Sequence, residues 1–277
     1  MVQRSRQADN FSAIFIVADA SKDQSASHDA VLAELERAKR FQRITFDVVS
    51  TQFAIHYMFE GERTLRGYLA NVAQRLEVGG AFIGTTVDSD RLVSKIREAG
   101  AEKDLTIGND LFSVVFGQDS FDRGRGPFGL KYYFYLSDAV GKKQVADQKV
   151  KYVPEYLVQF DYLREIALEY DLKLEKKENF HEYYNKKMKE PCHCHSQSCA
   201  NVHEKEAQAY SRLFENMVKR NMPELDQESL DQQWEIVGLY CIFLFRKVGQ
   251  RTGGRRGRAN FGNYKLVRDV INQKNWE

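Results

Sequence analysis

Short apolar strand patterns alternate with amphipathic helix patterns through the first two-thirds of the chain. Residues 15–18 and 46–53 predict strands, and residues 30–38 predict a helix between them. Residues 62–77 predict a second helix, because their apolar side chains recur at steps of three and four, and residues 81–85 predict the next strand. This order is typical of parallel strands joined by crossover helices. The sequence therefore predicts an α/β fold built on an open, mostly parallel sheet.

The later part of the chain has a more antiparallel pattern. Residues 111–116 and 130–136 predict strands, the second of them rich in aromatic side chains. Residues 153–170 predict one long helix with Pro154 in its first turn, where proline is tolerated. Residues 236–245 are strongly apolar and favour extended structure, so they predict a buried strand.

The net charge of +2 indicates little about partners, but the basic residues are unevenly placed. Six basic residues and no acidic residue lie between Arg246 and Arg258. We expect residues 248–277 to form a flexible Arg/Gly tail that adds sequence-independent contacts with phosphate groups. No run of 18 apolar residues is present and residues 1–10 are polar, so neither a transmembrane helix nor a signal peptide is expected.

Three of the four cysteines, Cys192, Cys194 and Cys199, lie within eight residues of one another. This clustering is not typical of a disulfide framework and favours a reducing, intracellular location. Together with His203, these cysteines could supply four soft ligands to zinc. Their spacing differs from the paired C-x₂-C pattern of zinc ribbons and fingers, so a surface loop is the favoured interpretation and zinc the alternative.

An amide, two aromatic rings and an imidazole lie at the carboxyl end of the strand predicted at residues 46–53 and just beyond it. They belong to Gln52, Phe53, His56 and Tyr57. In open α/β sheets ligands bind beyond the carboxyl ends of the strands, so this group predicts a pocket for a flat, polar ring. The alternative is a strand end followed by a half-buried aromatic helical turn, and the pattern taken alone favours that alternative.

The segment FDVVSTQFAIHYMFE at residues 46–60 resembles the signature loop of the eukaryotic mRNA cap guanine-N7 methyltransferases. The resemblance spans about residues 11–247 in one order, which is far more specific than any single motif. It implies a Rossmann-like class I methyltransferase sheet with an antiparallel cap-binding insertion. The further segments that carry it are FSAIFIVAD at 11–19, GGAFIGTT at 79–86, PFGLKY at 127–132, VPEYLV at 153–158 and LYCIFLF at 239–245.

The resemblance implies a cap-guanine pocket lined by Phe53, His56, Tyr57, Glu155 and Tyr240. A carboxylate such as Glu155 suits the N1–H and N2–H₂ donors of guanine, and His56 could donate to O6. The aromatic rings would lie against the base, which becomes cationic when N7 is methylated. Without the resemblance, Glu155 is equally well explained as a carboxylate in the first turn of a helix.

The resemblance also implies S-adenosylmethionine as methyl donor, with Asp19, Gln52 and Tyr57 on the donor side. The alternative for Asp19 is a turn cap before Ser21. The family's glycine-rich donor loop, DLGCGKGGD, does not occur in the chain, so two central strands at the N-terminal end of the expected sheet are missing. We therefore expect weak donor binding by this chain alone.

The resemblance implies methyl transfer without an acid–base pair or a metal. N7 of guanine already carries a lone pair in the ring plane, so no residue has to remove a proton. The protein would act through proximity, alignment and an electrostatic environment that tolerates charge moving from sulfur to guanine. Accordingly, the sequence predicts binding residues and no catalytic residue.

The resemblance divides the chain into a partial S-adenosylmethionine-binding part at residues 1–110, a cap-binding and C-terminal sheet part at 111–247, and the tail at 248–277. The function it implies is mRNA cap guanine-N7 methylation in the nucleus, on the capped 5′ end of pre-mRNA. RNA polymerase II capping machinery or an activating subunit are the implied partners. A non-catalytic cap- or RNA-binding methyltransferase fragment is the alternative, and a generic small-molecule methyltransferase is a third function class.

Overall fold

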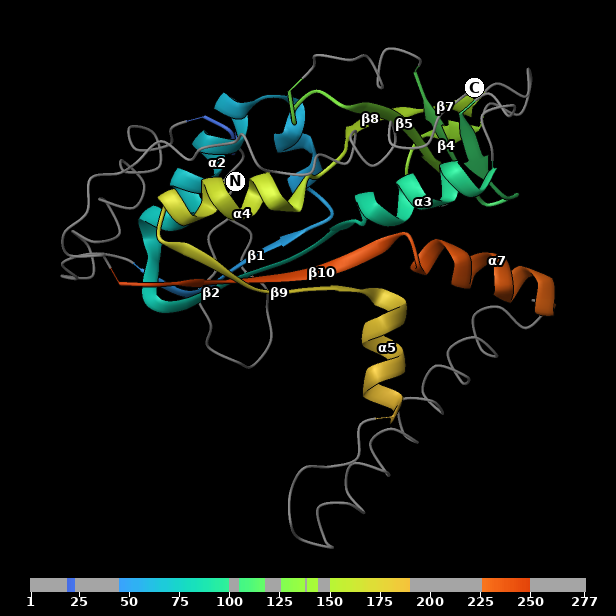
Figure 1. Ribbon diagram of the computed structural model, residues 1–277. Coiled ribbons are helices and arrows are strands. Elements are labelled where there is room, and N and C mark those ends of the chain that lie inside the picture. Colours follow the sequence, from blue (N-terminus) through green and yellow to red (C-terminus); the bar gives the residue numbers. More distant parts are fainter. Residues whose placement is uncertain are drawn as a thin grey trace, which may run out of the picture.

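The computed structural model describes residues 19–22, 45–99, 105–117, 126–137, 139–143, 150–189 and 226–249. Within them the chain forms two four-stranded sheets and a two-stranded ribbon, with helices packed on the sheets (Figure 1). This arrangement confirms the predicted α/β class. The strand expected at residues 15–18, the helix expected at 30–38, the cysteine cluster and the tail beyond residue 249 lie outside the described residues.

The first sheet is mixed rather than mostly parallel. Strands β1 and β2 run parallel, with Val49 opposite Phe82, whereas β10 runs antiparallel to both β2 and β9. The parallel pair is joined by the short 3₁₀ helix η1 (Ile55–Glu60) and helix α2 (Glu62–Arg75), the crossover helix that the sequence predicts. In spatial order the strands are β1 (Phe46–Gln52), β2 (Leu76–Val87), β10 (Tyr240–Lys247) and β9 (Leu172–Asn179).

The second sheet is antiparallel throughout, which confirms the antiparallel part that the sequence predicts. The strands predicted at residues 111–116 and 130–136 correspond to its two inner strands. A separate ribbon pairs β6 (Lys142–Lys143) with β7 (Val150–Lys151). In spatial order the sheet holds β3 (Thr106–Gly108), β4 (Phe112–Phe116), β5 (Lys131–Leu136) and β8 (Val153–Tyr156).

Two helices cover one face of the first sheet. Helices α2 and α4 (Phe160–Glu169) lie on this face in Figure 1. Their fully buried Leu69 and Ile166 belong to the same core as Phe82 and Phe245 of the sheet. Burying such side chains is the main stabilising contribution to the fold.

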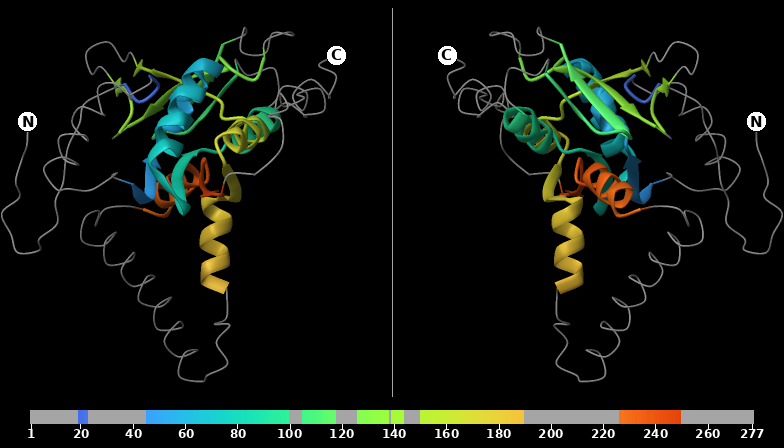
Figure 2. Two further views of the ribbon diagram at one scale, coloured as in Figure 1. Left: turned by 90° about the vertical axis from the view of Figure 1, so that its left-hand side faces the viewer. Right: turned by 90° about the vertical axis from the view of Figure 1, so that its right-hand side faces the viewer.

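A second core lies around α3 (Ser89–Ala99), which follows β2 directly. The apolar face of α3, including Leu92 and Ile96, packs with Val114 and Phe134 of the antiparallel sheet. Helix α5 (Phe180–Lys189) projects away from the two sheets in every view, while α7 (Gln227–Val237) leads into β10 (Figures 1 and 2). None of the helices in the described ranges is long and apolar enough to cross a membrane.

The helix predicted over residues 153–170 is wrong in its first part. Val153–Tyr156 form strand β8, and α4 begins only at Phe160. Pro154 lies opposite Tyr133 on a strand with one pairing neighbour in the sheet, the position in which a residue without an N–H group is tolerated. Glu155 is therefore a strand residue, and the explanation of it as a helix first-turn carboxylate is excluded.

The strand predicted over residues 236–245 is wrong at its start. Helix α7 continues to Val237, Gly238 caps it, and β10 begins at Tyr240. A continuous apolar run does not by itself distinguish a helix end from a buried strand. Strand β9 does not show a strand pattern in the sequence, because its many lysines and glutamates obscure one. Neither β9 nor helix α5, which follows it, is predicted above.

Candidate functional site

Glu155 lies at the centre of a buried polar group. Strands β8 and β5 pair so that Glu155 stands opposite Tyr132, and residues at opposed positions have side chains on the same face. Tyr132 Oη donates a hydrogen bond of 2.7 Å to Glu155 Oε2. Tyr132 is fully buried and Glu155 is only 3% exposed. The bond fixes one carboxylate oxygen, and the other, Oε1, faces His56.

His56 approaches this carboxylate from η1. Its Nε2 lies 3.5 Å from Glu155 Oε1, and its Nδ1 lies 3.5 Å from Thr86 Oγ1. Both distances are at the long limit of a hydrogen bond, and the buried Nε2 has no hydrogen-bond partner among the described residues. Because buried polar atoms are normally paired, the imidazole and Oε1 are suited to a ligand that offers polar groups to both.

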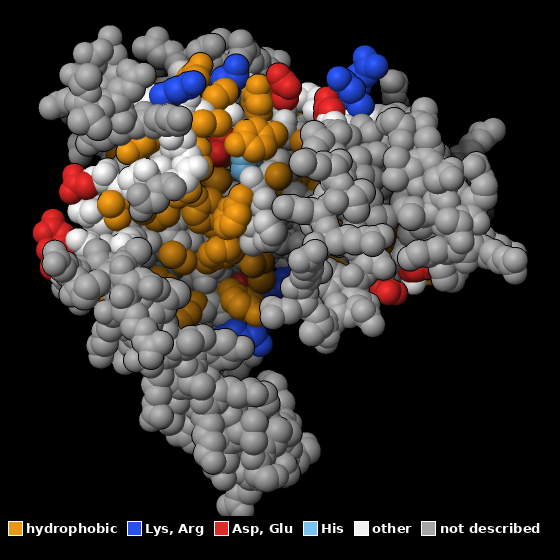
Figure 3. All heavy atoms as spheres, turned by 180° about the vertical axis from the view of Figure 1, so that it is seen from behind, with side chains coloured by type: hydrophobic (Ala, Val, Ile, Leu, Met, Phe, Trp, Pro, Cys, Tyr) orange, Lys and Arg blue, Asp and Glu red, His pale blue; other side chains and the backbone are white. Residues whose placement is uncertain are grey.

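Aromatic side chains surround the imidazole and the carboxylate. The Tyr57 and His56 ring centroids are 4.2 Å apart, and Phe53 meets Tyr240 edge to face at 5.0 Å. Phe53 and Tyr57 are 48% and 38% exposed, so these rings reach the surface. Figure 3, the view from behind, shows hydrophobic side chains gathered around a histidine and an acidic side chain. The arrangement provides ring faces beside buried polar groups, which suits a flat, polar ligand.

The backbone at Phe53 is held in an uncommon conformation. Phe53 has a φ of +50°, in the left-handed region that residues other than glycine rarely adopt. Its N–H donates to the carbonyl of Thr85 at 3.0 Å, which anchors the residue to the end of β2. Such local strain is characteristic of functional sites, and here it directs an exposed ring toward Tyr240.

Burial shifts the ionisable groups toward their neutral forms. Burial lowers the pKa of His56 to about 4, and it raises the pKa of Glu155 to about 7, although the hydrogen bond from Tyr132 opposes the latter shift. Burial is the larger cause and the charge of the nearby Glu155 carboxylate the smaller cause of a raised pKa at Tyr57 and at Tyr240. Near neutral pH the site therefore holds a neutral imidazole, neutral phenols and a carboxyl group close to half ionised.

The stability of Glu155→Gln relative to the wild type should increase as the pH rises from about 4.5 to about 7. Because the pKa is raised on folding, the folded protein retains a proton that the unfolded chain releases, and the wild type loses stability across this window. At about 1.4 kcal/mol for each tenfold change in proton affinity, the loss is about 3 kcal/mol. Thermal unfolding of both proteins at about pH 5 and about pH 8 measures the change in their difference.

The lowered pKa of His56 makes stability rise with pH, the opposite of the effect of Glu155. The wild type and Glu155→Gln both contain His56. Its lowered pKa stabilises the fold above about 6.5, and this contribution is lost as the pH falls through about 4. Comparing the two proteins at each pH removes this contribution from the difference. A difference that stays constant from acid to neutral pH would contradict the raised pKa of Glu155.

Gln52 and Asp19, two residues predicted on the donor side, make hydrogen bonds in separate parts of the structure. Gln52 ends β1, and its Oε1 accepts a hydrogen bond of 2.9 Å from Thr85 Oγ1. The Asp19 carboxylate accepts hydrogen bonds of 3.0 and 2.6 Å from the N–H and hydroxyl of Ser21, the turn cap that was the alternative for it. Asn71 of α2 donates to carbonyl oxygens of the same turn, so this turn rests on α2.

The structure brings the predicted cap-pocket residues into contact with one another, but it does not do so for all of the predicted donor-side residues. The structure brings His56 together with Glu155 and Tyr57, and Tyr240 together with Phe53. On the donor side, Gln52 lies at the carboxyl end of β1, whereas the half-exposed Asp19 is engaged in its own turn. The described residues therefore fit S-adenosylmethionine only in part.

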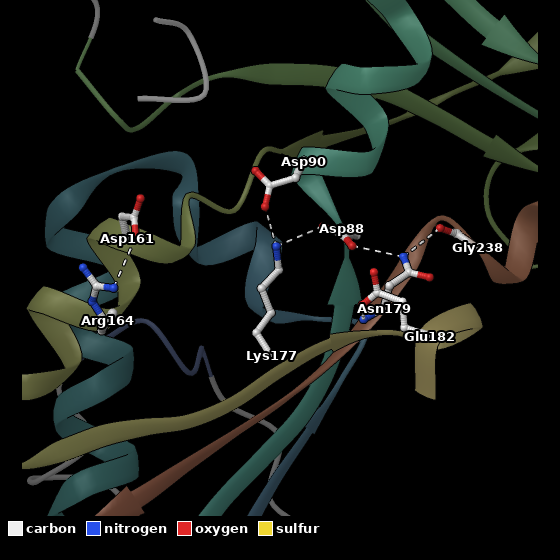
Figure 4. A network of polar contacts seen from close by, with 8 residues as sticks. All are labelled: Asp88, Asp90, Asp161, Arg164, Lys177, Asn179, Glu182 and Gly238. Atoms are coloured by element: carbon white, nitrogen blue, oxygen red, sulfur yellow. Dashed lines mark hydrogen bonds and ion pairs between the residues drawn. The ribbon is translucent and has the colours of Figure 1, made fainter. Parts of the chain in front are cut away.

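A polar network fixes the turn that precedes Tyr240 (Figure 4). Asn179, the last residue of β9, donates hydrogen bonds of 3.0 Å from Nδ2 to Asp88 Oδ2 and to the carbonyl of Gly238. Lys177 Nζ lies 3.1 Å from Asp88 Oδ1, with Asp88 at the end of β2. The network links β9, β2 and the α7–β10 turn, so it determines where Tyr240 enters the site.

Sequence reasoning missed Tyr132, Lys177 and Asn179. Tyr132 lies within the PFGLKY segment that carries the family resemblance, but its contact with Glu155 depends on how β5 and β8 pair. Lys177 and Asn179 belong to β9, whose charged sequence does not indicate a strand. A correct prediction of strand pairing is the signal that would have identified all three.

No group of three or more His, Cys, Asp or Glu side chains that could hold a metal ion occurs in the described part of the chain. The weak zinc candidates Cys192, Cys194, Cys199 and His203 lie outside it. The favoured surface loop and the zinc alternative therefore both stay untested.

Residues 1–248 match the family model described as the mRNA (guanine-N(7))-methyltransferase domain. The chain belongs to this family. The match confirms the resemblance of the loop at residues 46–60, and it includes every residue of the candidate site described above, from Phe53 to Tyr240.

Relatives in the guanine-N7 methyltransferase family match most of the chain. The mRNA cap guanine-N(7) methyltransferase 1 of Arabidopsis thaliana is 34% identical over 231 residues, which cover 82% of this chain and 54% of that protein. The protein of the same name from Oryza sativa subsp. japonica is 31% identical over 236 residues, covering 83% and 56%. The chain spans about half the length of these relatives.

Solved structures are more distant. A S-adenosylmethionine-dependent methyltransferase from Clostridium acetobutylicum aligns with a TM-score of 0.33 and 11% identity, over 81% of this chain and 73% of that one. A likeness at this level carries no argument about the site.

Proposed function

We propose that this protein is an mRNA cap guanine-N7 methyltransferase, which transfers a methyl group from S-adenosylmethionine to N7 of the cap guanine. The observation that carries the proposal is the buried Glu155 carboxylate, held by Tyr132 through one oxygen and facing His56 with the other. Family membership and the exposed aromatic rings of Phe53 and Tyr57 support the same assignment.

Guanine complements this site chemically. Its N1–H and N2–H₂ groups are adjacent donors, for which an ionised carboxylate at Glu155 is the matching acceptor. His56 is neutral at physiological pH, because burial lowers its pKa to about 4, so it can donate one N–H to O6 without adding charge. Adenine reverses the donor and acceptor at N1 and at position 6 and has only a C–H at position 2, so the same groups discriminate against it.

The aromatic residues explain how the site could hold the methylated guanine that the reaction produces. Methylation of N7 makes the base cationic, and the π faces of Phe53, Tyr57 and Tyr240 stabilise a cation next to them. No general base is needed, because N7 already carries its lone pair. These residues therefore act by holding the base in line and by excluding water from it.

Bound S-adenosylmethionine would supply an electrophilic methyl group on a sulfonium. Gln52 and Tyr57 would hold it at the carboxyl end of β1, where open α/β sheets bind ligands. The Asp19 carboxylate already accepts two hydrogen bonds from Ser21 through Oδ1 and lies 3.3 Å from the Lys22 ammonium through Oδ2, so a donor would compete with these partners for it. That competition favours weak donor binding by this chain alone.

A cap-binding protein without transfer activity is the second candidate function. The observation in its favour is that the predicted acceptor residues converge while Asp19 is engaged in its own turn. Calorimetric titration with S-adenosylhomocysteine, at protein and ligand concentrations that detect weak binding, separates the two functions: the methyltransferase binds it measurably, even if weakly, and the cap-binding protein does not. Under either function we propose a nuclear protein that acts on the capped 5′ end of pre-mRNA, with the RNA polymerase II capping machinery or an activating subunit as partner.

The experiment that tests the acceptor pocket compares two cap dinucleotides. The chain is expected to bind GpppG at least about tenfold more tightly than ApppA, since an unpaired buried donor or acceptor costs about 1–3 kcal/mol. Isothermal titration at about pH 8, where Glu155 is ionised, gives both affinities. Equal affinity for the two dinucleotides would overturn the assignment of the pocket to guanine.

A further inference from the structure

We propose that the surface formed by α5 and the exposed end of Trp234 on α7 binds the single-stranded RNA that follows the cap. This inference rests on the proposed function, because it extends the acceptor site to the rest of the transcript. Phe180, the first residue of α5, has its ring centroid 6.0 Å from that of Tyr240. Helix α5 therefore begins at the pocket and, as Figures 1 and 2 show, leads away from the sheets.

Three aromatic rings on this surface are open to solvent. Tyr183, Tyr184 and Trp234 are 37%, 46% and 38% exposed. Tyr184 meets Trp234 edge to face at a centroid distance of 5.1 Å, so two of the rings form one cluster. Aromatic rings in this setting are the usual stacking partners of unpaired bases, and the stacking does not depend on sequence.

The cluster is held rigidly, which lowers the entropy lost on binding. His181 stacks on Trp234 at a centroid distance of 4.2 Å, and its Nε2 lies 2.7 Å from the Trp234 carbonyl oxygen. Gly238 makes this stack possible, because a Cβ there would lie 2.4 Å from the His181 ring. The rings are therefore already arranged before any ligand arrives.

Two lysines lie against one of the exposed rings, that of Tyr183. The ammonium of Lys176 is 4.6 Å from the centroid of Tyr183, and that of Lys187 is 5.9 Å from it. Glu178 lies 2.6 Å from Lys176 and 3.9 Å from Lys186, and its side chain is only 14% exposed. The Glu178 carboxylate is thus shielded by the lysines. Glu182, the other acidic residue, is exposed in the first turn of α5 and accepts a hydrogen bond of 3.4 Å from the Asn179 N–H, so the positive charge of α5 lies further along the helix, at Lys186 and Lys187.

The combination of rings and lysines favours RNA over a protein partner. Protein interfaces are enriched in tyrosine and tryptophan but depleted of lysine. Surfaces for single-stranded nucleic acids combine aromatic rings with basic side chains that contact phosphates. A ten-residue helix is about 15 Å long, so α5 offers an extended track that starts beside the cap guanine.

Affinity for a capped RNA should therefore exceed affinity for the cap alone. Fluorescence anisotropy with the full chain compares GpppG with a GpppG-capped RNA of about 12 nucleotides, a length within the range that single-stranded sites accommodate. Tyr184→Ala should weaken binding of the capped RNA about tenfold and leave GpppG binding unchanged. Lys187→Glu should weaken RNA binding and make its dependence on salt concentration shallower.

Matched controls come from the antiparallel sheet and the two-stranded ribbon, which lie outside the proposed surface. Tyr133→Ala removes a ring that is 40% exposed on β5, and Lys151→Glu reverses an exposed charge on β7; neither should alter RNA binding. Thermal unfolding establishes that each variant is folded.

The outcomes separate this inference from the proposed function. Wild-type protein that binds GpppG and the capped RNA equally well would overturn the inference and would favour a protein occupant of this surface. Losses of the same size in the control variants, or equal losses for GpppG and RNA, would also overturn it. Wild-type protein that binds RNA but shows no affinity for GpppG would overturn the proposed function and leave the RNA surface standing.

Discussion

Glu155→Ala is expected to weaken binding of GpppG about 100-fold. Without the carboxylate, the N1–H and N2–H₂ groups of guanine are buried unpaired, at a cost of about 1–3 kcal/mol for each hydrogen bond lost, and about 3 kcal/mol corresponds to about 100-fold. The loss is large because Glu155 is 3% exposed, so water cannot readily replace it. Isothermal titration of wild type and variant at about pH 8 measures the ratio.

Glu175→Ala provides the control for this substitution. Glu175 is a carboxylate on strand β9 of the other four-stranded sheet, it pairs with Arg246 at 3.1 Å, and its side chain is 41% exposed. Exposed pairs contribute little, so cap affinity should stay within about twofold of the wild type. A loss below about threefold in Glu155→Ala, with the variant still folded, would remove Glu155 from guanine recognition.

Phe82→Ala should destabilise the fold by about 3–5 kcal/mol, which is a large part of the stability of a typical domain. Phe82 is fully buried on β2 and lies within 5.2 Å of Phe243 and 5.8 Å of Phe245, measured between ring centroids. Alanine would leave a cavity between α2 and the centre of the first sheet. Equilibrium unfolding in urea gives the free energy of unfolding of the wild type and the variant.

Val78→Ala is the matched control, since Val78 lies on the same strand and is 67% exposed. Its free energy of unfolding should stay within about 0.5 kcal/mol of the wild type. A similar effect from both substitutions would mean that Phe82 does not belong to a packed core.

Much of the fold follows from periodic patterns that act locally. The steps of three and four in α2 and the apolar segments on either side of it are enough to predict a strand–helix–strand unit, and the structure contains it. The order of strands in the sheet does not follow in this way. Strand β10 lies between β2 and β9, although it comes last in the described chain, and no local pattern encodes such non-local pairing.

Local patterns also failed where tertiary context decides the conformation. Pro154 was assigned to a helix start, but pairing with β5 makes its segment an edge strand. The run around Gly238 was assigned to a single strand, although its first residues complete α7. Apolar residues satisfy either structure, so only packing separates the two.

The grouping of the candidate site residues could be predicted because of the family resemblance rather than because of their chemistry. His56 and Glu155 are 99 positions apart in the chain, and no spacing rule connects them. Their convergence depends on η1 lying against β8, and the bond from Tyr132 depends on strand register. Asp19 is the opposite case, in which local sequence was the better guide. The structure contains the turn cap that the local sequence offers as the alternative for this residue.

A crystal structure of the chain with GpppG bound tests the central claim most directly. The claim predicts guanine beside the rings of Phe53, Tyr57 and Tyr240, with N1 and N2 about 2.7–3.2 Å from the Glu155 carboxylate and O6 at a similar distance from His56. Guanine bound elsewhere, with Glu155 still bonded to Tyr132 and to no part of the base, would contradict the claim.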